Sequence, residues 1–172
     1  MTRVLLIRNR QQARRVNTAA LRRLTRRLLE HHLALSSFEL GLHLVGAEEM
    51  ARVNQQFLQH AGSTDVITFD HQAAAGPAEC SDAAARPVLH GELFVSIEDA
   101  VAQGRRFGTS WQAELVRYIV HGLLHLQGHD DHAPAVRRKM KRAEDRLVRV
   151  LARESCLEDL GRRAARRARP VA

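Results

Sequence analysis

The sequence predicts an α+β fold in which a small β-sheet of mixed direction is covered by helices. Three observations support this prediction. Short apolar or alternating runs, typical of strands, are interspersed with longer stretches of helical apolar spacing along the 172 residues. One helical stretch, residues 110–128, is apolar around most of its circumference, as a buried central helix would be. The hydrophobic fraction of 45% is sufficient for the core of one domain.

The N-terminal third of the chain is expected to form two strands, each followed by a helix. Residues 3–8, RVLLIR, are a short apolar run, and residues 17–35 then place leucines at helical spacing. Residues 37–46 alternate polar and apolar side chains, as a half-buried strand does. The next twelve residues, AEEMARVNQQFL, predict a helix with Met50, Val53 and Phe57 turned inward.

The remaining elements follow on both sides of a low-complexity segment. Residues 63–71 and 91–100 contain two further strands, and the second leads into a helix ending near Phe107. The segment between them, residues 72–87, is small and polar, which indicates a mobile surface loop. A Thr109-x-x-Gln112 capping box is expected to open the central helix, which ends at Gly128.

A last helix is expected over residues 133–153, with an apolar stripe on one face. The stripe consists of Val136, Met140, Ala143, Leu147 and Leu151. We therefore predict a single domain over residues 1–160. Residues 161–172 contain five arginines and almost no apolar side chains, so they are expected to be a basic, disordered tail that could hold RNA.

Composition limits the partners and the location. The net charge of +8 comes mostly from arginine and favours a polyanionic partner, such as nucleic acid, over an acidic small molecule. No apolar run approaches the ~20 residues needed to span a membrane, so we expect a cytoplasmic protein without a membrane segment. Cys80 and Cys156 lie far apart and form no CxxC motif, so neither a disulfide framework nor a cysteine-rich zinc knuckle is supported.

A cluster of histidines ends the central helix, in the sequence HGLLHLQGHDDH. His121 and His125 stand four residues apart, so their side chains project from one face and can grip one metal ion. The pattern H-x3-H-x2-G-x2-D is shared with zincin-type hydrolases, which bind zinc in this way. Metalloproteases of that kind have a glutamate directly after the first histidine, and here that position is Gly122.

Three motifs in order resemble the YbeY family of bacterial rRNA maturation endoribonucleases. HGLLHLQGHDD is similar to its H-G-x-L-H-L-x-G-[aromatic]-D-H motif, and STDVITF and GELFVS are similar to PTDVLSF and GDIVIS. The resemblance runs from about Asn54 to the end of the last helix. It implies a zinc-dependent hydrolase that cleaves single-stranded RNA, takes part in maturation of the small-subunit (16S) rRNA 3′ end and in ribosome quality control, and has rRNA precursor and the ribosome as partners.

The sequence departs from the family pattern at four positions. Leu58 replaces an arginine thought to face the RNA, and Ser63 replaces the proline of PTDV. His129 replaces an aromatic residue, and Asp131 replaces the third histidine. Another arginine must therefore substitute for the one missing at Leu58, or activity must be weaker.

The predicted metal ligands are His121, His125 and Asp131, holding one Zn²⁺ per chain. The register of the family motif selects Asp131, because its third ligand falls six residues after the second and a methionine, here Met140, follows nine residues later. Histidine is the better zinc ligand by type, so His132 stays open as an alternative.

Neighbouring acidic residues are expected to support the ligands. Asp65 could cap or brace its strand or could hydrogen-bond a ligand histidine, and Asp130 is expected to act similarly. Glu92 is expected to have a structural role, and His43 to be an ordinary strand residue. Five further histidines lack ligand spacing and are expected at the surface: His31, His32, His60, His71 and His90. The general base is left unassigned.

Two other functions remain as alternatives. A zincin-like metalloprotease is disfavoured by Gly122 and by the basic charge. A ribosome assembly factor with a structural zinc is disfavoured by the count of three ligands, because structural zinc usually has four protein ligands.

Overall fold

The computed structural model describes residues 2–72 and 88–162, so the predicted loop around Cys80 and most of the predicted basic tail lie outside the described residues. The fold is α+β, as predicted. The strands are β1 (Arg3–Asn9), β2 (Ser37–Val45), β3 (Val66–Asp70) and β4 (Val88–Ser96). The helices are α1 (Thr18–Arg27), α2 (Ala47–Leu58), α3 (Ile97–Phe107), α4 (Trp111–Leu126) and α5 (Pro134–Glu154). A π-helical turn, Leu28–His32, extends α1, and a 3-10 turn, Leu157–Leu160, follows α5.

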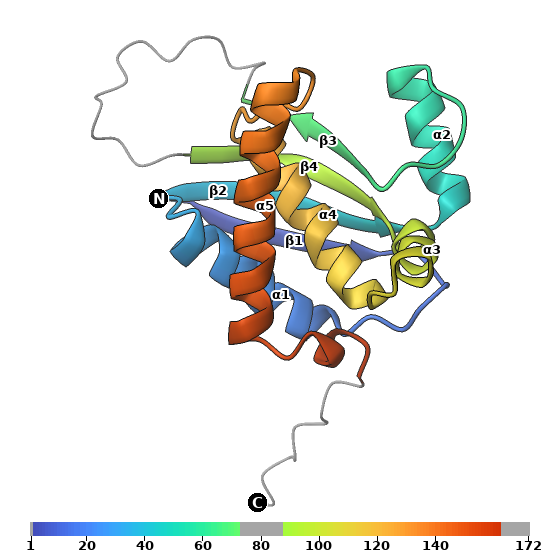
Figure 1. Ribbon diagram of the computed structural model, residues 1–172, viewed down its shortest axis with the longest axis horizontal. Coiled ribbons are helices and arrows are strands. Elements are labelled where there is room, and N and C mark those ends of the chain that lie inside the picture. Colours follow the sequence, from blue (N-terminus) through green and yellow to red (C-terminus); the bar gives the residue numbers. More distant parts are fainter. Residues whose placement is uncertain (1, 73–87, 163–172) are drawn as a thin grey trace, which may run out of the picture.

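The sheet has the strand order β1-β2-β4-β3. β1, β2 and β4 are parallel to one another, and β3 is antiparallel to β4. The parallel connection from β1 to β2 runs through α1, and α2 and β3 lie between the parallel strands β2 and β4 along the chain (Figure 1). The sheet is therefore mixed, because β3 returns beside β4 in the opposite direction.

The two faces of the sheet are covered by different helices. The main core joins one face to α1, α4 and α5 through fully buried side chains such as Leu21, Leu93 and Ile119. A smaller cluster of Val45, Met50 and Ile67 lies beneath α2 on the other face. Alternation along the strands explains this separation, because Leu93 and Phe94 are neighbours in β4 and point to opposite faces.

A glycine lets α4 approach the sheet closely. A Cβ atom at Gly122 would lie 2.7 Å from Leu93 Cδ2 and 3.1 Å from Val66 Cγ2. A larger side chain would have to push the helix away from β3 and β4. Gly122 thus sets the depth at which the neighbouring histidine is held.

Three details of the predicted elements were wrong. Phe57 and Val136, both expected to face inward, are 55% and 39% exposed. The helix α4 is capped by Ser110, whose Oγ accepts from Ala113 N, while the Thr109 hydroxyl donates to Glu114. A serine directly after a threonine offers two cap registers, and the observed one begins the helix one residue later.

The end of α4 turns the chain back toward the helix. Gly128 has a φ of +81°, a conformation that glycine adopts without strain, and His129 N donates to Leu124 O at 3.0 Å. Pro134 then begins α5, where the missing N–H leaves no helical bond unmade. Within the described ranges, no helix is both long and apolar enough to cross a membrane.

Candidate metal centre

The rings of His121 and His125 lie together on α4 and are partly buried. Their centroids are 4.6 Å apart, and the two Nε2 atoms are 3.0 Å apart. His121 Nδ1 lies 3.0 Å from Glu144 Oε2, and His125 Nδ1 lies 3.0 Å from the carbonyl oxygen of His129. A carboxylate and a carbonyl can only accept, so both Nδ1 atoms carry the proton and donate. Both Nε2 lone pairs are therefore free to bind a metal ion.

This arrangement fits a zinc ion. Two imidazole nitrogens bound to one tetrahedral Zn²⁺ at about 2.0–2.1 Å would lie about 3.3 Å apart. The observed separation of the Nε2 atoms of His121 and His125 is 3.0 Å. At this distance the two Nε2 atoms can share a proton, and a metal ion that takes the place of this proton would be bound by both rings.

Asp131 lies near the pair, and His132 does not. Asp131 Oδ2 is 4.0 Å from His125 Nε2, and one ligand atom from each of His121, His125 and Asp131 lies within 4.8 Å of the others. The His132 side chain is 92% exposed and faces Asp130 Oδ1 at 3.7 Å. The structure thus brings together the three residues predicted as ligands, and it leaves the alternative His132 pointing to solvent.

A second group can be drawn around the same aspartate. Asp130, Asp131 and His132 also have ligand atoms within 4.8 Å of one another, but they are consecutive residues of a loop. Two of the three are exposed, and His132 has no anchored ring. The group around His121 and His125 is the better candidate, because two of its three ligands are held in place by oxygen acceptors.

Glu144 of α5 completes the surroundings of the pair, and the sequence reasoning missed it. Its carboxylate is 5% exposed and accepts hydrogen bonds from His121 Nδ1, Arg117 Nη1 and Lys141 Nζ. Burial opposes ionisation, but these hydrogen bonds outweigh it and lower the pKa of Glu144 to about 2. The hydrogen bond to Glu144 in turn raises the pKa of His121, against the effect of burial.

A signal for Glu144 was present in the sequence. It lies four residues after Met140 and three before Leu147, within the apolar stripe of α5. A carboxylate at such a position is buried and needs partners. The stripe therefore indicated that Glu144 would be buried against another element, but it did not indicate that its partner would be His121.

The other predicted supporting residues brace backbone and do not touch the pair. Asp65 Oδ1 accepts from Thr64 Oγ1 and from Val66 N, at the start of β3. Asp130 Oδ1 accepts from His132 N at 3.0 Å, which tightens the loop after Gly128. These contacts fit the bracing alternative for both aspartates.

His43 and Glu92 lie together on the α2 face of the sheet. The His43 ring is buried, stacks on Phe94 with centroids 4.5 Å apart, and has Nε2 3.7 Å from Glu92 Oε2. Burial lowers the pKa of His43. His43 lies in β2, as expected, and belongs to no metal-ligating group of the described residues.

The histidines without ligand spacing lie at or near the surface. His31, His60, His71 and His90 are exposed, and His32 is partly buried against Glu154, with Nε2 2.9 Å from its Oε2. At the position of the missing family arginine, Leu58 is 48% exposed at the end of α2.

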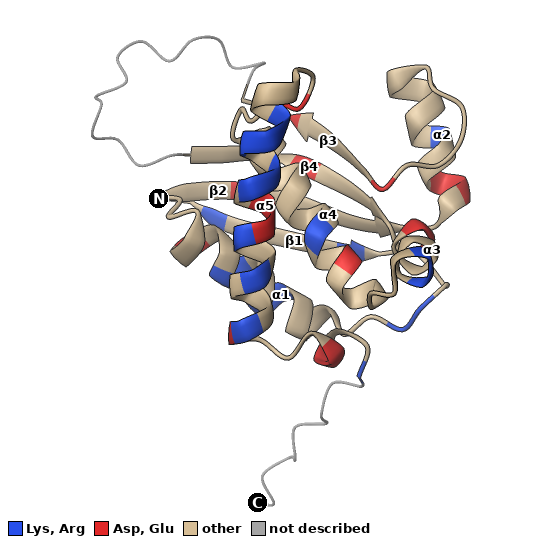
Figure 2. Cartoon of the chain, viewed as in Figure 1, with Lys and Arg blue, Asp and Glu red and all other residues tan. Residues whose placement is uncertain are grey.

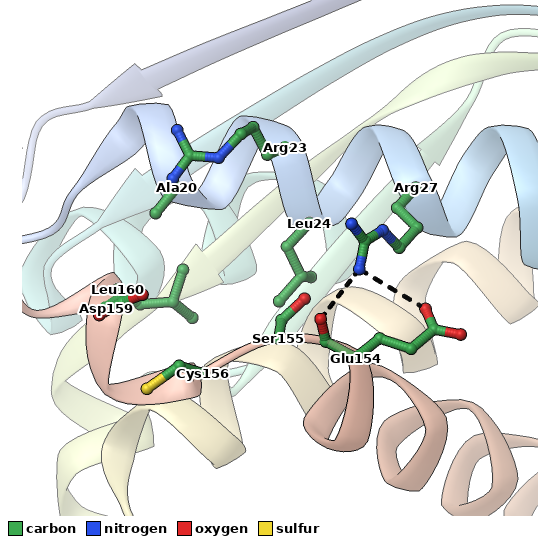
Figure 3. A pocket seen from close by; sticks show the side chains of 9 residues that line it. All are labelled: Ala20, Arg23, Leu24, Arg27, Glu154, Ser155, Cys156, Asp159 and Leu160. Carbon is green, nitrogen blue, oxygen red and sulfur yellow. Dashed lines mark hydrogen bonds and ion pairs between the residues drawn. The ribbon is translucent and has the colours of Figure 1, made fainter.

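Two hollows of the described chain differ in chemistry. A small one of about 50 Å³ adjoins the histidine pair and is lined by His121, Asp131, Arg137, Met140, Lys141 and Glu144. A larger one, of about 250 Å³, lies between α1 and the turn after α5 (Figure 3). There Arg27 Nη1 pairs with Glu154, 3.0 Å from its carbonyl oxygen and 3.8 Å from Oε2. No metal-ligating group of three described side chains lies in the larger hollow.

The protein has a mixed sheet packed on a helix, and this helix bears an i,i+4 histidine pair followed by a glycine turn and a carboxylate. These features place it in the class of proteins with a zincin-like candidate metal site. Within that class, the chain belongs to the YbeY family: the family model described as "Endoribonuclease YbeY" matches residues 6–152. The predicted resemblance is confirmed, and the match begins well before Asn54, where the sequence motifs first indicated it.

Curated relatives agree with this placement, and one solved structure shares the fold. The chain is 38% identical over 112 residues to the endoribonuclease YbeY of Salinibacter ruber, covering 65% of this chain and 69% of that protein. It is 31% identical over 117 residues to that of Chlorobium luteolum, covering 68% and 77%. The solution structure of TM1509 from Thermotoga maritima matches with a TM-score of 0.56 at 24% identity, covering 93% and 100%, and shows the likeness of fold.

Proposed function

We propose that the protein is a zinc-dependent endoribonuclease that cleaves single-stranded RNA and acts in maturation of the 16S rRNA 3′ end and in ribosome quality control. Family membership supports the nuclease activity. One observation above all supports the metal: two imidazoles on α4, each anchored through Nδ1, turn their Nε2 atoms toward each other at 3.0 Å. We assign His121, His125 and Asp131 as the ligands of one Zn²⁺ per chain.

The residues around the site hold its ligands in one orientation. Glu144 and the His129 carbonyl fix both rings with Nε2 outward, so little ordering is needed when the ion binds. Three protein ligands leave one position of a tetrahedral ion open. Zinc, when bound at such a site, lowers the pKa of a water molecule from 15.7 toward about 7 and so supplies a nucleophile at neutral pH.

The basic surface supports the binding of a polyanionic substrate. Lysine and arginine gather along α5 and on α1 (Figure 2), two helices that cover the same face of the sheet as α4. On α1 these are Arg22, Arg23, Arg26 and Arg27. Contacts of this kind neutralise phosphates irrespective of base, and the affinity they give falls as salt rises. This agrees with a substrate held by its backbone.

A metalloprotease is the less well supported alternative. Position 122, where such enzymes have their glutamate base, faces the sheet, and a Cβ there would lie 2.7 Å from Leu93 Cδ2. A glutamate at this position could not reach the cluster without displacing α4. A structural zinc is also less well supported, because the candidate group contains three described ligands and not four.

The location and the domain limits are part of the same proposal. We propose a cytoplasmic protein with a single domain over residues 1–160 and a basic tail over residues 161–172. Such a protein would meet rRNA precursor and the small ribosomal subunit as partners.

The test combines metal analysis with parallel activity assays. Purified protein should contain one zinc per chain by elemental analysis, and it should cleave a labelled single-stranded RNA while leaving casein intact. In cells lacking the gene, precursor 16S rRNA with unprocessed 3′ ends should accumulate. Cleavage of casein alone would favour the metalloprotease. A folded His125→Ala variant that restored normal 3′ ends in those cells would favour the assembly factor.

A further inference from the structure

Arg137 lies beside the candidate metal centre, in the first turn of α5. Its Nε donates to the carbonyl oxygen of Asp131 at 2.8 Å. Its side chain lines the small hollow that His121 and Asp131 also line. The guanidinium is therefore attached to the loop that bears the third predicted ligand.

No described acidic side chain neutralises the charge of Arg137. Arg117 pairs with Glu144 and Asp145, and Lys141 pairs with the same two carboxylates. Arg137 is exposed and forms no ion pair with any described residue. Its one hydrogen bond uses Nε and goes to a neutral carbonyl, so both Nη groups keep their donors and the full positive charge remains.

A guanidinium held in this way is suited to a phosphate. Its planar fork donates two parallel hydrogen bonds to phosphate oxygens, and the bond through Nε fixes the plane in advance. Because Arg137 lines the same hollow as His121 and Asp131, a phosphate bound to it would lie next to the candidate ligands.

We propose that Arg137 binds the phosphodiester that is cleaved and holds it at the metal centre. This inference rests on the proposed function, and it adds the residue that orients the substrate. Positive charge next to a phosphate that gains negative charge during hydrolysis also stabilises the transition state. Arg137 then acts both in binding the backbone and in the chemical step.

A purely structural role would give different results. Through Nε, Arg137 could simply brace the Asp131 loop, and its loss would then release zinc. The Arg137→Lys variant separates charge from shape, because lysine keeps the charge but has no fork. Arg52→Ala is the matched control: Arg52 is an exposed arginine of α2, which covers the other face of the sheet, so the same charge is removed from the face opposite to α4.

The experiment compares the zinc-loaded wild type with Arg137→Ala, Arg137→Lys and Arg52→Ala, all as full-length chains. Zinc content is measured by elemental analysis, and kcat and KM are measured on a single-stranded RNA oligonucleotide. Affinity is measured by fluorescence anisotropy with a phosphorothioate-substituted RNA that resists cleavage, at several salt concentrations.

We expect Arg137→Ala to keep one zinc per chain and to lose about 100-fold or more in kcat/KM, the size of effect seen when one preorganised donor to a transition state is removed. The slope of log affinity against log salt should become shallower by about 0.7, corresponding to one phosphate contact on a single strand. Arg137→Lys should recover part of the affinity and little of kcat. Arg52→Ala should keep the wild-type kcat.

Two results would overturn the inference. Loss of zinc from Arg137→Ala to the same extent as from Asp131→Ala would make Arg137 a brace of the loop. Wild-type kcat/KM and affinity in Arg137→Ala would show that the residue does not contact substrate. If the wild type cleaves no RNA, the proposed function fails, and the anisotropy measurement alone decides whether Arg137 binds the backbone.

Discussion

Among the described residues, two histidine pairs have similar ring separations and different surroundings. The rings of His121 and His125 on α4 have centroids 4.6 Å apart, and those of His71 and His90, beside β3 and on β4, have centroids 5.2 Å apart. In the first pair both Nδ1 atoms have oxygen acceptors at 3.0 Å. In the second pair, the closest described carboxylate is Glu39, 3.8 Å from His90 Nε2.

From this difference we expect the two pairs to differ in metal affinity, although their rings are about equally close. An exposed ring must be ordered when an ion binds, and that ordering costs free energy. A ring already held through Nδ1 has its lone pair aimed before the ion arrives, and such supporting contacts change metal affinity about 10–100-fold. The helix pair, His121 and His125, therefore differs from the strand pair, His71 and His90, mainly in the hydrogen-bond acceptors that hold the Nδ1 atoms of its rings.

The largest expected effect comes from removing one ring of the helix pair. His121→Ala or His125→Ala should abolish zinc binding and RNA cleavage, because two ligands cannot hold the ion at a three-ligand site. Zinc per chain is measured by elemental analysis after dialysis.

The same substitution in the strand pair is its control. His90→Ala and His71→Ala should keep one zinc per chain and change the free energy of unfolding by no more than about 0.5 kcal/mol, as is usual for exposed positions. Loss of zinc from His90→Ala would place the metal on the sheet and contradict the comparison.

The third ligand should give the next largest effect. Asp131→Ala should lose most of its zinc and its RNA cleavage, and His132→Ala should keep most of both, because the Asp131 carboxylate lies near His125 Nε2 and the His132 side chain is exposed to solvent. Zinc dissociation constants from competition with a chelator distinguish the two variants. If His132→Ala alone emptied the site, the loop after Gly128 would bind metal in a different register.

The anchoring of the rings is tested by Glu144→Gln. This change keeps the shape of the side chain but removes the negative charge of the carboxylate that accepts a hydrogen bond from His121 Nδ1. The zinc affinity should therefore fall by about 10–100-fold. The free energy of unfolding should fall by about 1–3 kcal/mol, because Arg117 and Lys141 lose a buried partner. Both quantities are measured on the same preparation, by chelator competition and by urea denaturation.

Asp145→Asn is the matched control for Glu144. Asp145 pairs with the same Arg117 and Lys141 and has no hydrogen bond to His121. Its loss should weaken the ion-pair network without changing zinc affinity. Equal zinc affinity in Glu144→Gln and wild type would mean that the hydrogen bond from His121 Nδ1 to the Glu144 carboxylate does not contribute to zinc affinity.

The smallest expected effect concerns the helix itself. Ser110→Ala removes the side chain that caps α4, which should lower the free energy of unfolding by about 1 kcal/mol. The zinc content should stay at one per chain, since the histidines are held near the other end of α4 by Glu144 and the His129 carbonyl. A parallel loss of zinc would show that the supporting contacts depend on the whole helix.

The parts of this protein that the sequence predicted correctly are those decided over a few residues. The helix over residues 47–58 has the predicted bounds, and His121 and His125 share a face because any helix places residues four apart on one side. The turn at Gly128 followed from the same local reasoning. Phe57 and Val136 were wrong because periodicity says which residues share a face, and not whether another element covers them.

By itself, then, the sequence predicted the mixed α+β architecture and the histidine pair, and the register of the family motif favoured Asp131 over His132. Only the tertiary structure decided that Glu144 stands behind His121, 23 residues away along the chain, and that Arg137 lines the same hollow. The physical reason is that spacing within a helix is set by its own hydrogen bonds. Which side chain of α5 meets which side chain of α4 is set by how the two helices cross, and that depends on the packing of the whole core.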